Sequence, residues 1–114
     1  MKINNYDFGR IVIDKKEYNH DLIVFADKVI SNWWRKEGHS LDVEDLKDVL
    51  EFNPKVIVVG VGFYGIMGVP KKTKDFIEKR GIRLIAQKTT QAYRTFNELA
   101  ESEEKVIGCF HLTC

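Results

Sequence analysis

Short runs of β-branched and aromatic residues, separated by polar pairs, occupy the first third of the chain. Arg10 to Asp14 (RIVID), Leu22 to Phe25 (LIVF) and Lys28 to Ile30 (KVI) are three such runs. Lys15-Lys16 and Ala26-Asp27 follow two of these runs and suit tight reversals of the chain. We therefore expect an N-terminal antiparallel β meander.

From Ser40 the spacing of apolar residues changes from a period of two to a period of 3.6. The apolar positions are Val43, Leu46, Val49 and Leu50. This spacing predicts an amphipathic helix, with Ser40 or Asp42 as its N-cap. The helix has to end before Pro54, because proline disfavours a helical conformation at the residue that precedes it.

The second half of the chain alternates strands with helices. Lys55 to Gly60 (KVIVVG) is almost entirely apolar, which is typical of a strand buried on both faces. Ile82 to Ala86 and Lys105 to Leu112 predict two further strands. The order βαβαβ after a meander predicts one α/β domain over residues 1–114, with helices covering a mixed sheet.

Each of the two helices between these strands has a predicted inward face and a predicted boundary. The first begins at Pro70 and closes at Gly81 as its C′ residue. The second is capped by Thr89 or Thr90. The residues expected to face inward are Thr73, Phe76 and Ile77 in the first helix and Ala92, Phe96 and Leu99 in the second.

Composition narrows the class of protein. A chain of 114 residues is too short for a two-domain enzyme, and a net charge of +1 gives no field that would attract a nucleic acid. The two cysteines do not form the pattern of a secreted disulfide scaffold. No apolar run is long enough to cross a membrane, and the first ten residues lack the apolar core of a signal peptide. We expect a soluble cytoplasmic protein.

The segment from Val58 to Pro70 (VVGVGFYGIMGVP) contains the spacing G-x-G-x-x-G at Gly60, Gly62 and Gly65. A dinucleotide site needs a helix that begins inside this motif and an acidic residue after the second strand. Here the helix is expected only from Pro70, and Gln87-Lys88 stands where the acid is needed. We therefore set dinucleotide binding aside and expect no cofactor.

Two interpretations of these glycines stay open. They allow a sharp exit from a buried strand, because glycine adopts positive φ and lets backbone approach backbone. Their N–H groups could also form a nest for a small anion or a peptide at the carboxyl end of a central strand. Phe63 and Tyr64, between the glycines, become interface residues if the loop is exposed.

The segment Asn32 to His39 (NWWRKEGH) combines Trp33 and Trp34 with Arg35 and Lys36. Such a set can stack a nucleobase or another ring and clamp an anion. Alternatively, the tryptophans seal the core while the basic side chains stay in solvent. If the tryptophans are exposed, they mark a surface for a partner.

The chain ends in CFHLTC, which contains Cys109, His111 and Cys114. In an extended strand Cys109 and His111 share a face and Cys114 does not, so these residues alone form neither a metal site nor a disulfide. Cys109 as a nucleophile activated by His111 is a possible catalytic pair. The alternative is a buried structural cysteine.

Several of these motifs together resemble the Mth-domain family of unknown function. The motifs are FGRIVID (8–14), DLIVF (21–25), NWWRKEGH (32–39), VVGVGFYGIMGVP (58–70), YRTFNEL (93–99) and HLTC (111–114). That family includes small prokaryotic proteins, the adipogenesis-associated Mth-domain-containing protein and a mitochondrial complex I assembly factor. The resemblance implies a three-layer α/β fold around a mixed sheet and no established activity. Val61 is a departure, because relatives more often have a small hydroxyl residue there.

Two hypotheses for the function follow. The first is a non-enzymatic binding or assembly module that uses a pocket between residues 58–70, which we call the glycine-rich loop, and residues 32–39, which we call the NWW segment. The second is a protein that binds a small anion, or a minor enzyme. In that case Gly60, Gly62 and Gly65 hold the anion, Arg35 or Lys36 neutralises it, and Cys109 or His111 supplies chemistry. The expected partner is a protein or a small anion, without a metal, a nucleic acid or membrane insertion.

Overall fold

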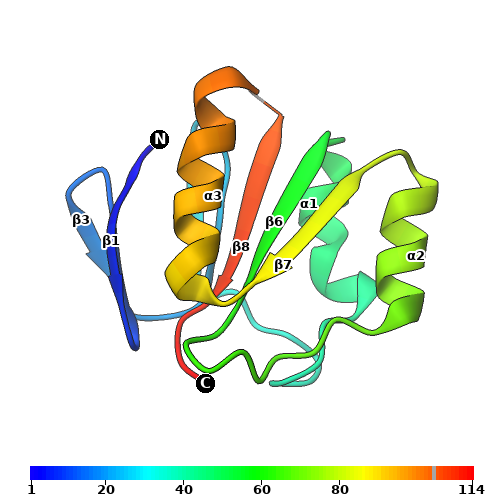
Figure 1. Ribbon diagram of the computed structural model, residues 1–114, viewed down its shortest axis with the longest axis horizontal. Coiled ribbons are helices and arrows are strands. Elements are labelled where there is room, and N and C mark those ends of the chain that lie inside the picture. Colours follow the sequence, from blue (N-terminus) through cyan, green and yellow to red (C-terminus); the bar gives the residue numbers. More distant parts are fainter. Residues whose placement is uncertain (104) are drawn as a thin grey trace.

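The computed structural model describes residues 1–103 and 105–114, and it contains two β-sheets (Figure 1). The first sheet has the order β1-β2-β3, and the second has the order β5-β4-β8-β6-β7. The strands are β1 (Ile3–Asp7), β2 (Arg10–Ile13), β3 (Lys16–Tyr18), β4 (Leu22–Val24), β5 (Val29–Ser31), β6 (Val56–Val61), β7 (Arg83–Gln87) and β8 (Val106–His111). The helices are the 3₁₀ helix η1 (Val43–Leu46) and the α-helices α1 (Lys47–Glu51), α2 (Lys71–Lys79) and α3 (Thr89–Ser102).

The second sheet is mixed, as the order of elements predicts. Strand β6 is parallel to both β7 and β8, whereas β4 is antiparallel to β5 and β8. The expected meander is therefore divided between two sheets. Strands β1 to β3 form the small antiparallel sheet, and the hairpin of β4 and β5 extends the large one.

Strand β1 was not among the expected elements. Only Ile3 and Tyr6 of this strand are buried, and they are three residues apart. An irregularity in the pairing with β2 falls between Ile3 and Asn5. Because a bulge adds one residue to a strand, it breaks the alternation from which strands are recognised.

Two hydrophobic clusters lie on opposite faces of the large sheet and produce the three layers. On β6, Ile57 and Val59 face the cluster that includes Leu46 and Ile77 of the short helices. Val58 faces the other cluster, which includes Phe96 of α3. Figure 1 shows α3 between the N-terminal strands and the large sheet, with α1 and α2 on the other side.

The helix boundaries confirm some predictions and correct others. Asp42 is the N-cap of η1 and forms a capping box with Asp45, and Gly81 has a φ of +78° just after α2. Thr89 is not a cap, because Lys88 holds that position without a side-chain hydrogen bond. Phe76 was expected to face inward but is 39% exposed.

The parallel strands β6, β7 and β8 end at the same edge of the sheet. The glycine-rich loop after β6 and the C-terminal residues after β8 lie together at this end (Figure 1). The segment after β5 joins them, since the Gly68 N–H donates to the carbonyl of His39 at 2.8 Å. We call this end of the molecule the carboxyl edge. No helix in the described part of the chain is long and apolar enough to cross a membrane.

Candidate functional site

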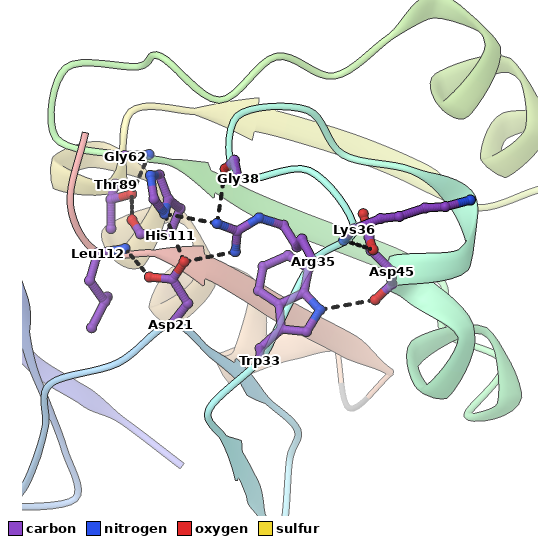
Figure 2. A network of polar contacts seen from close by, with 10 residues as sticks. All are labelled: Asp21, Trp33, Arg35, Lys36, Gly38, Asp45, Gly62, Thr89, His111 and Leu112. Atoms are coloured by element: carbon purple, nitrogen blue, oxygen red, sulfur yellow. Dashed lines mark hydrogen bonds and ion pairs between the residues drawn. The ribbon is translucent and has the colours of Figure 1, made fainter.

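A buried polar cluster at the carboxyl edge joins Asp21, Arg35 and His111 (Figure 2). Asp21 precedes β4 and His111 ends β8, and Leu22 pairs with Phe110 in the antiparallel register. The next position therefore brings Asp21 opposite His111, with Oδ2 2.7 Å from the imidazole Nδ1. Arg35 comes from the segment after β5, and its Nη1 lies 2.7 Å from the same oxygen.

The carboxylate of Asp21 is the centre of this cluster. Its other oxygen, Oδ1, accepts the Leu112 N–H at 2.7 Å. Burial, the largest influence on its pKa, favours the protonated acid. Hydrogen bonds from His111, from the Leu112 backbone and from Arg35 together outweigh burial and hold the pKa of Asp21 below its ordinary value. Asp21 is therefore ionised at neutral pH.

An ionised Asp21 determines how the proton of His111 is placed. Nδ1 of His111 lies near both the carboxylate and Nη2 of Arg35, the latter at 3.2 Å. A single ring nitrogen cannot donate and accept in the same plane, and the shorter contact is with the carboxylate. Nδ1–H therefore donates to Asp21, and Nη2 donates to the carbonyl of Gly38 at 3.0 Å. Nε2 of His111 is buried and has no hydrogen-bond partner among the described residues.

The two adjacent tryptophans have opposite environments. Trp33 is 7% exposed. Its indole N–H donates to the Asp45 carbonyl at 2.9 Å, and the guanidinium of Arg35 lies 4.9 Å from its ring centroid. Trp34 is 81% exposed. The structure thus joins Trp33 to Arg35 and leaves Trp34 in solvent.

Lys36 is separate from the polar cluster. Its side chain is exposed, and its Nζ lies 3.5 Å from the Glu44 carboxylate on η1. Its backbone N–H donates to Asp45 Oδ1 at 2.9 Å, which ties the segment to η1 (Figure 2). Of the two basic residues considered as anion ligands, only Arg35 reaches the cluster, and its guanidinium is paired there.

The N–H groups of the glycine-rich loop bond within the protein. Gly62 N–H donates to the hydroxyl of Thr89 at 2.9 Å, and Gly65 N–H donates to the carbonyl of Gly62 at 3.3 Å. Phe63 N–H donates to the carbonyl of Thr113 at 2.7 Å. Gly60 is part of β6, between β7 and β8. An anion nest needs free amides, and these glycines offer none.

The same glycines are needed for close packing. A Cβ on Gly60 would come within 2.7 Å of the Thr89 hydroxyl, and one on Gly62 would overlap the carbonyl group of Cys114. Gly62 and Gly65 also have φ values of +100° and +74°, which other residues adopt at a cost. Of the two interpretations left open, these contacts support the structural turn.

Cys109 lies inside the apolar cluster that includes Ile57 and Ile107. Complete burial raises the pKa of its thiol, and the charge of Arg35 offsets this only in part. The thiol therefore stays protonated at neutral pH, whereas a nucleophilic cysteine must reach the thiolate. Within the described residues, no group of three or more His, Cys, Asp or Glu side chains is placed to hold a metal ion.

A second feature of the carboxyl edge is a group of exposed aromatic rings. Phe8, in the turn between β1 and β2, lies with its ring centroid 6.0 Å from Phe63 and 6.1 Å from Tyr64. These three side chains are 49%, 37% and 62% exposed, and Ile66 on the same loop is 51% exposed. We call Phe8, Phe63 and Tyr64 the aromatic surface. The sequence predicts Phe63 and Tyr64 to be interface residues if their loop is exposed, and both side chains are exposed.

Asp21, Thr89 and Phe8 are residues of this region that sequence reasoning did not select for a site. Asp21 stands directly before an apolar strand, which was the available signal. Thr89 was read as a helix cap, but its buried hydroxyl donates to the carbonyl of His111 at 2.7 Å. It thereby connects α3 with the ends of β6 and β8.

Comparisons with known proteins identify relatives along the whole chain. The family described as protein of unknown function (DUF498/DUF598) matches residues 3–111. A protein of Francisella tularensis subsp. holarctica called 13 kDa major membrane protein is 28% identical over 105 residues, covering 91% of this chain and 84% of that protein. A conserved hypothetical protein of Pyrococcus horikoshii OT3 is 27% identical, with a TM-score of 0.83 and complete coverage of both chains. A Mth938-like domain from Bordetella pertussis has a TM-score of 0.77 and covers 97% of this chain and 85% of its own; at 16% identity it supports the fold alone.

Proposed function

The chain belongs to the family of proteins of unknown function DUF498/DUF598, and we propose that it is a non-enzymatic binding module that docks a protein partner through the aromatic surface. Family membership and the Mth938-like neighbours confirm the resemblance read from the motifs. They assign no activity, so the proposal is argued from the carboxyl edge itself.

The observation that carries the proposal is the contact between exposed rings from two separate parts of the chain. Phe8 lies in the turn that joins β1 and β2 of the small sheet, and Phe63 and Tyr64 lie in the glycine-rich loop that follows β6 of the large sheet. Aromatic side chains are enriched in protein interfaces, where they supply most of the binding energy at a few positions. Grouped apolar side chains left in water are costly, and a partner that covers them recovers that free energy.

A buried tyrosine packs against the aromatic surface from inside the protein. Tyr6 is buried and lies with its ring centroid 6.4 Å from Phe63. Its hydroxyl donates to the carbonyl of Leu112 at 2.7 Å, and burial, with a smaller effect of Asp21, raises the pKa of Tyr6 to about 12. The phenol therefore remains a donor at all moderate pH values. A surface held in place before binding loses less conformational entropy when a partner docks.

The chemistry of the carboxyl edge favours this proposal over the alternative, which is a protein that binds a small anion or acts as a minor enzyme. The amides of Gly62 and Gly65 are used inside the protein, and the thiol of Cys109 is protonated and buried. We also propose that the protein acts in the cytoplasm, which its two free cysteines support. Because the Francisella relative is called a membrane protein, a partner bound to a membrane is an outcome to look for.

The test compares capture of proteins by the wild type and by the double variant Phe63→Ser/Tyr64→Ser. Each of the two proteins is immobilised on a resin and exposed to a cell extract of the source organism. Proteins that only the wild type retains are identified and purified. The dissociation constant of each purified pair is then measured by calorimetry. We expect the double variant to bind roughly 30-fold more weakly, because the loss of a single interface hot spot costs about 2 kcal/mol.

Phe76→Ser is the matched control, since Phe76 is an aromatic residue on α2 that is also 39% exposed. It is expected to capture the same partner with unchanged affinity. Unfolding curves of all three proteins establish that each is folded. Equal affinity of the double variant and the wild type, or no protein that distinguishes them, contradicts the proposal.

A further inference from the structure

A cavity of about 250 Å³ lies beside the NWW segment, and the proposed function does not use it. Its lining includes Asn19, Asp21, Asn32, Trp34, Arg35 and Thr113. The lining thus combines side chains that precede β4, side chains that follow β5 and one from the C-terminal segment. Cavities of roughly 300–1,000 Å³ hold drug-sized ligands, so this one suits a ligand no larger than a single fused ring system.

The charges around the cavity favour an uncharged ligand. Among the described residues that line it, the basic side chains are Arg35 and the exposed His20. Nη1 of Arg35 lies 2.7 Å from the Asp21 carboxylate. Lys36 does not line the cavity, and its ammonium lies near Glu44. An anion entering here would meet a guanidinium already neutralised by a carboxylate, together with that carboxylate.

The lining of the cavity includes Trp33, Trp34 and several hydrogen-bonding side chains. The indole of Trp34 is 81% exposed, which leaves its ring free to stack on a planar ligand. The amides of Asn19 and Asn32 each carry a donor and an acceptor side by side, the arrangement that pairs with the edge of a nucleobase. Asn19 uses its Nδ2 on Glu17 at 3.3 Å, which leaves its amide oxygen as an acceptor.

We propose that this cavity binds a nucleobase, stacked on Trp34 and held at its edge by the amides of Asn32 and Asn19. The base can belong to a free nucleoside or to a single-stranded oligonucleotide, since both present the same ring. A charged phosphate contributes little to this binding, because the lining holds no lysine or arginine without a carboxylate partner. The site is separate from the aromatic surface, and this proposal does not depend on the proposed function.

The experiment titrates the full chain with adenosine, guanosine, cytidine and uridine, and separately with an eight-nucleotide single strand and with inorganic phosphate. Tryptophan fluorescence and the indole N–H signal of Trp34 in NMR spectra report binding. We expect at least one nucleoside to quench the fluorescence saturably and to shift that signal, and inorganic phosphate to do neither. If the oligonucleotide binds more tightly than the nucleoside, with the same dependence on Trp34, the natural source is a strand; otherwise it is the free nucleoside.

Three variants test the assigned contacts. Trp34→Ala is expected to weaken binding roughly 10-fold or more, because stacking of a base on an aromatic ring is worth about 1–3 kcal/mol. Trp34→Phe keeps a ring and is expected to keep most of the affinity. Asn32 has a φ of +57°, so Asn32→Gly removes the amide without straining the backbone, and it is expected to weaken binding several-fold. NMR signals report the variants that lack Trp34.

Phe76→Ala and the double variant Phe63→Ser/Tyr64→Ser serve as controls and are expected to bind nucleosides like the wild type. The double variant thus separates this site from the proposed protein interface, because it should lose the partner and keep the base. The proposal is overturned if no nucleoside binds saturably, if Trp34→Ala binds as well as the wild type, or if inorganic phosphate competes with the nucleoside.

Discussion

Gly62 shows how a single missing side chain shapes the carboxyl edge. Its φ of +100° disfavours any other residue, and a Cβ there would overlap the carbonyl group of Cys114. We expect Gly62→Ala to lower the free energy of unfolding by about 2–4 kcal/mol, from backbone strain and overpacking together. Urea denaturation followed by circular dichroism measures this change.

Gly38→Ala is the control for that variant. A Cβ on Gly38 meets no atom within 4 Å, so its free energy of unfolding should stay within about 0.5 kcal/mol of the wild type. If Gly62→Ala is as stable as Gly38→Ala, the structural explanation of the glycine-rich loop fails.

Asp21 links the buried cluster to pH. Its pKa in the folded protein lies below its ordinary value, so its contribution to stability is complete above the unfolded pKa of about 4 and disappears as pH falls through the folded pKa. At pH 7 we expect Asp21→Asn to lower the free energy of unfolding by about 3 kcal/mol, because it leaves the charge of Arg35 buried without its partner.

Measuring both proteins from pH 7 to pH 2.5 checks this expectation. The difference in free energy of unfolding between the wild type and Asp21→Asn should stay constant down to about pH 4. It should shrink below that pH, because the wild-type carboxylate then becomes protonated and loses its charge. A difference that is the same at all pH values would show that the carboxylate charge does not stabilise the fold.

The members of the cluster differ in how well sequence could predict them. Arg35 and His111 were selected for their chemistry, yet as ligands or catalysts rather than as partners of each other. Asp21 was missed, because its contact with His111 spans 90 residues and depends on the register of β4 against β8. The sequence does not distinguish which of the adjacent residues Trp33 and Trp34 is buried.

At the scale of elements, Thr89 joins the start of α3 to the ends of two strands. Its hydroxyl accepts the Gly62 N–H and donates to the carbonyl of His111. Thr89→Val keeps the shape and removes both bonds, so we expect a loss of about 2–3 kcal/mol in the free energy of unfolding. Exposed Thr90 supplies the control Thr90→Val, and an equal effect of the two variants in urea denaturation would contradict this role.

Elements with a clear period were predictable, and those shaped by their neighbours were not. Strands β6, β7 and β8 and helices α2 and α3 begin within about two residues of the positions that periodicity predicts. Strand β1 was not predicted, because its irregular pairing with β2 breaks the alternation of buried and exposed residues. Of the three α2 residues predicted to face inward, Thr73 and Ile77 are buried, but Phe76 is exposed.

At the scale of the whole molecule, the order of elements was enough to predict one α/β domain with a mixed sheet. It was not enough to locate an open pocket. Ligands of open α/β sheets often bind beside the carboxyl ends of the central strands. Here Thr89 and the C-terminal segment fill that place, since Thr113 and Cys114 accept N–H groups from Phe63 and Ile66 of the glycine-rich loop.

In the function that we propose, this filled edge presents the aromatic surface to a protein partner. The most direct test is the dissociation constant of the purified partner for the wild type, for Phe63→Ser/Tyr64→Ser and for Phe76→Ser, measured by calorimetry under one set of conditions. We expect the dissociation constant to increase roughly 30-fold for the double variant and to stay unchanged for Phe76→Ser. A dissociation constant that is the same for all three proteins would contradict the proposed function.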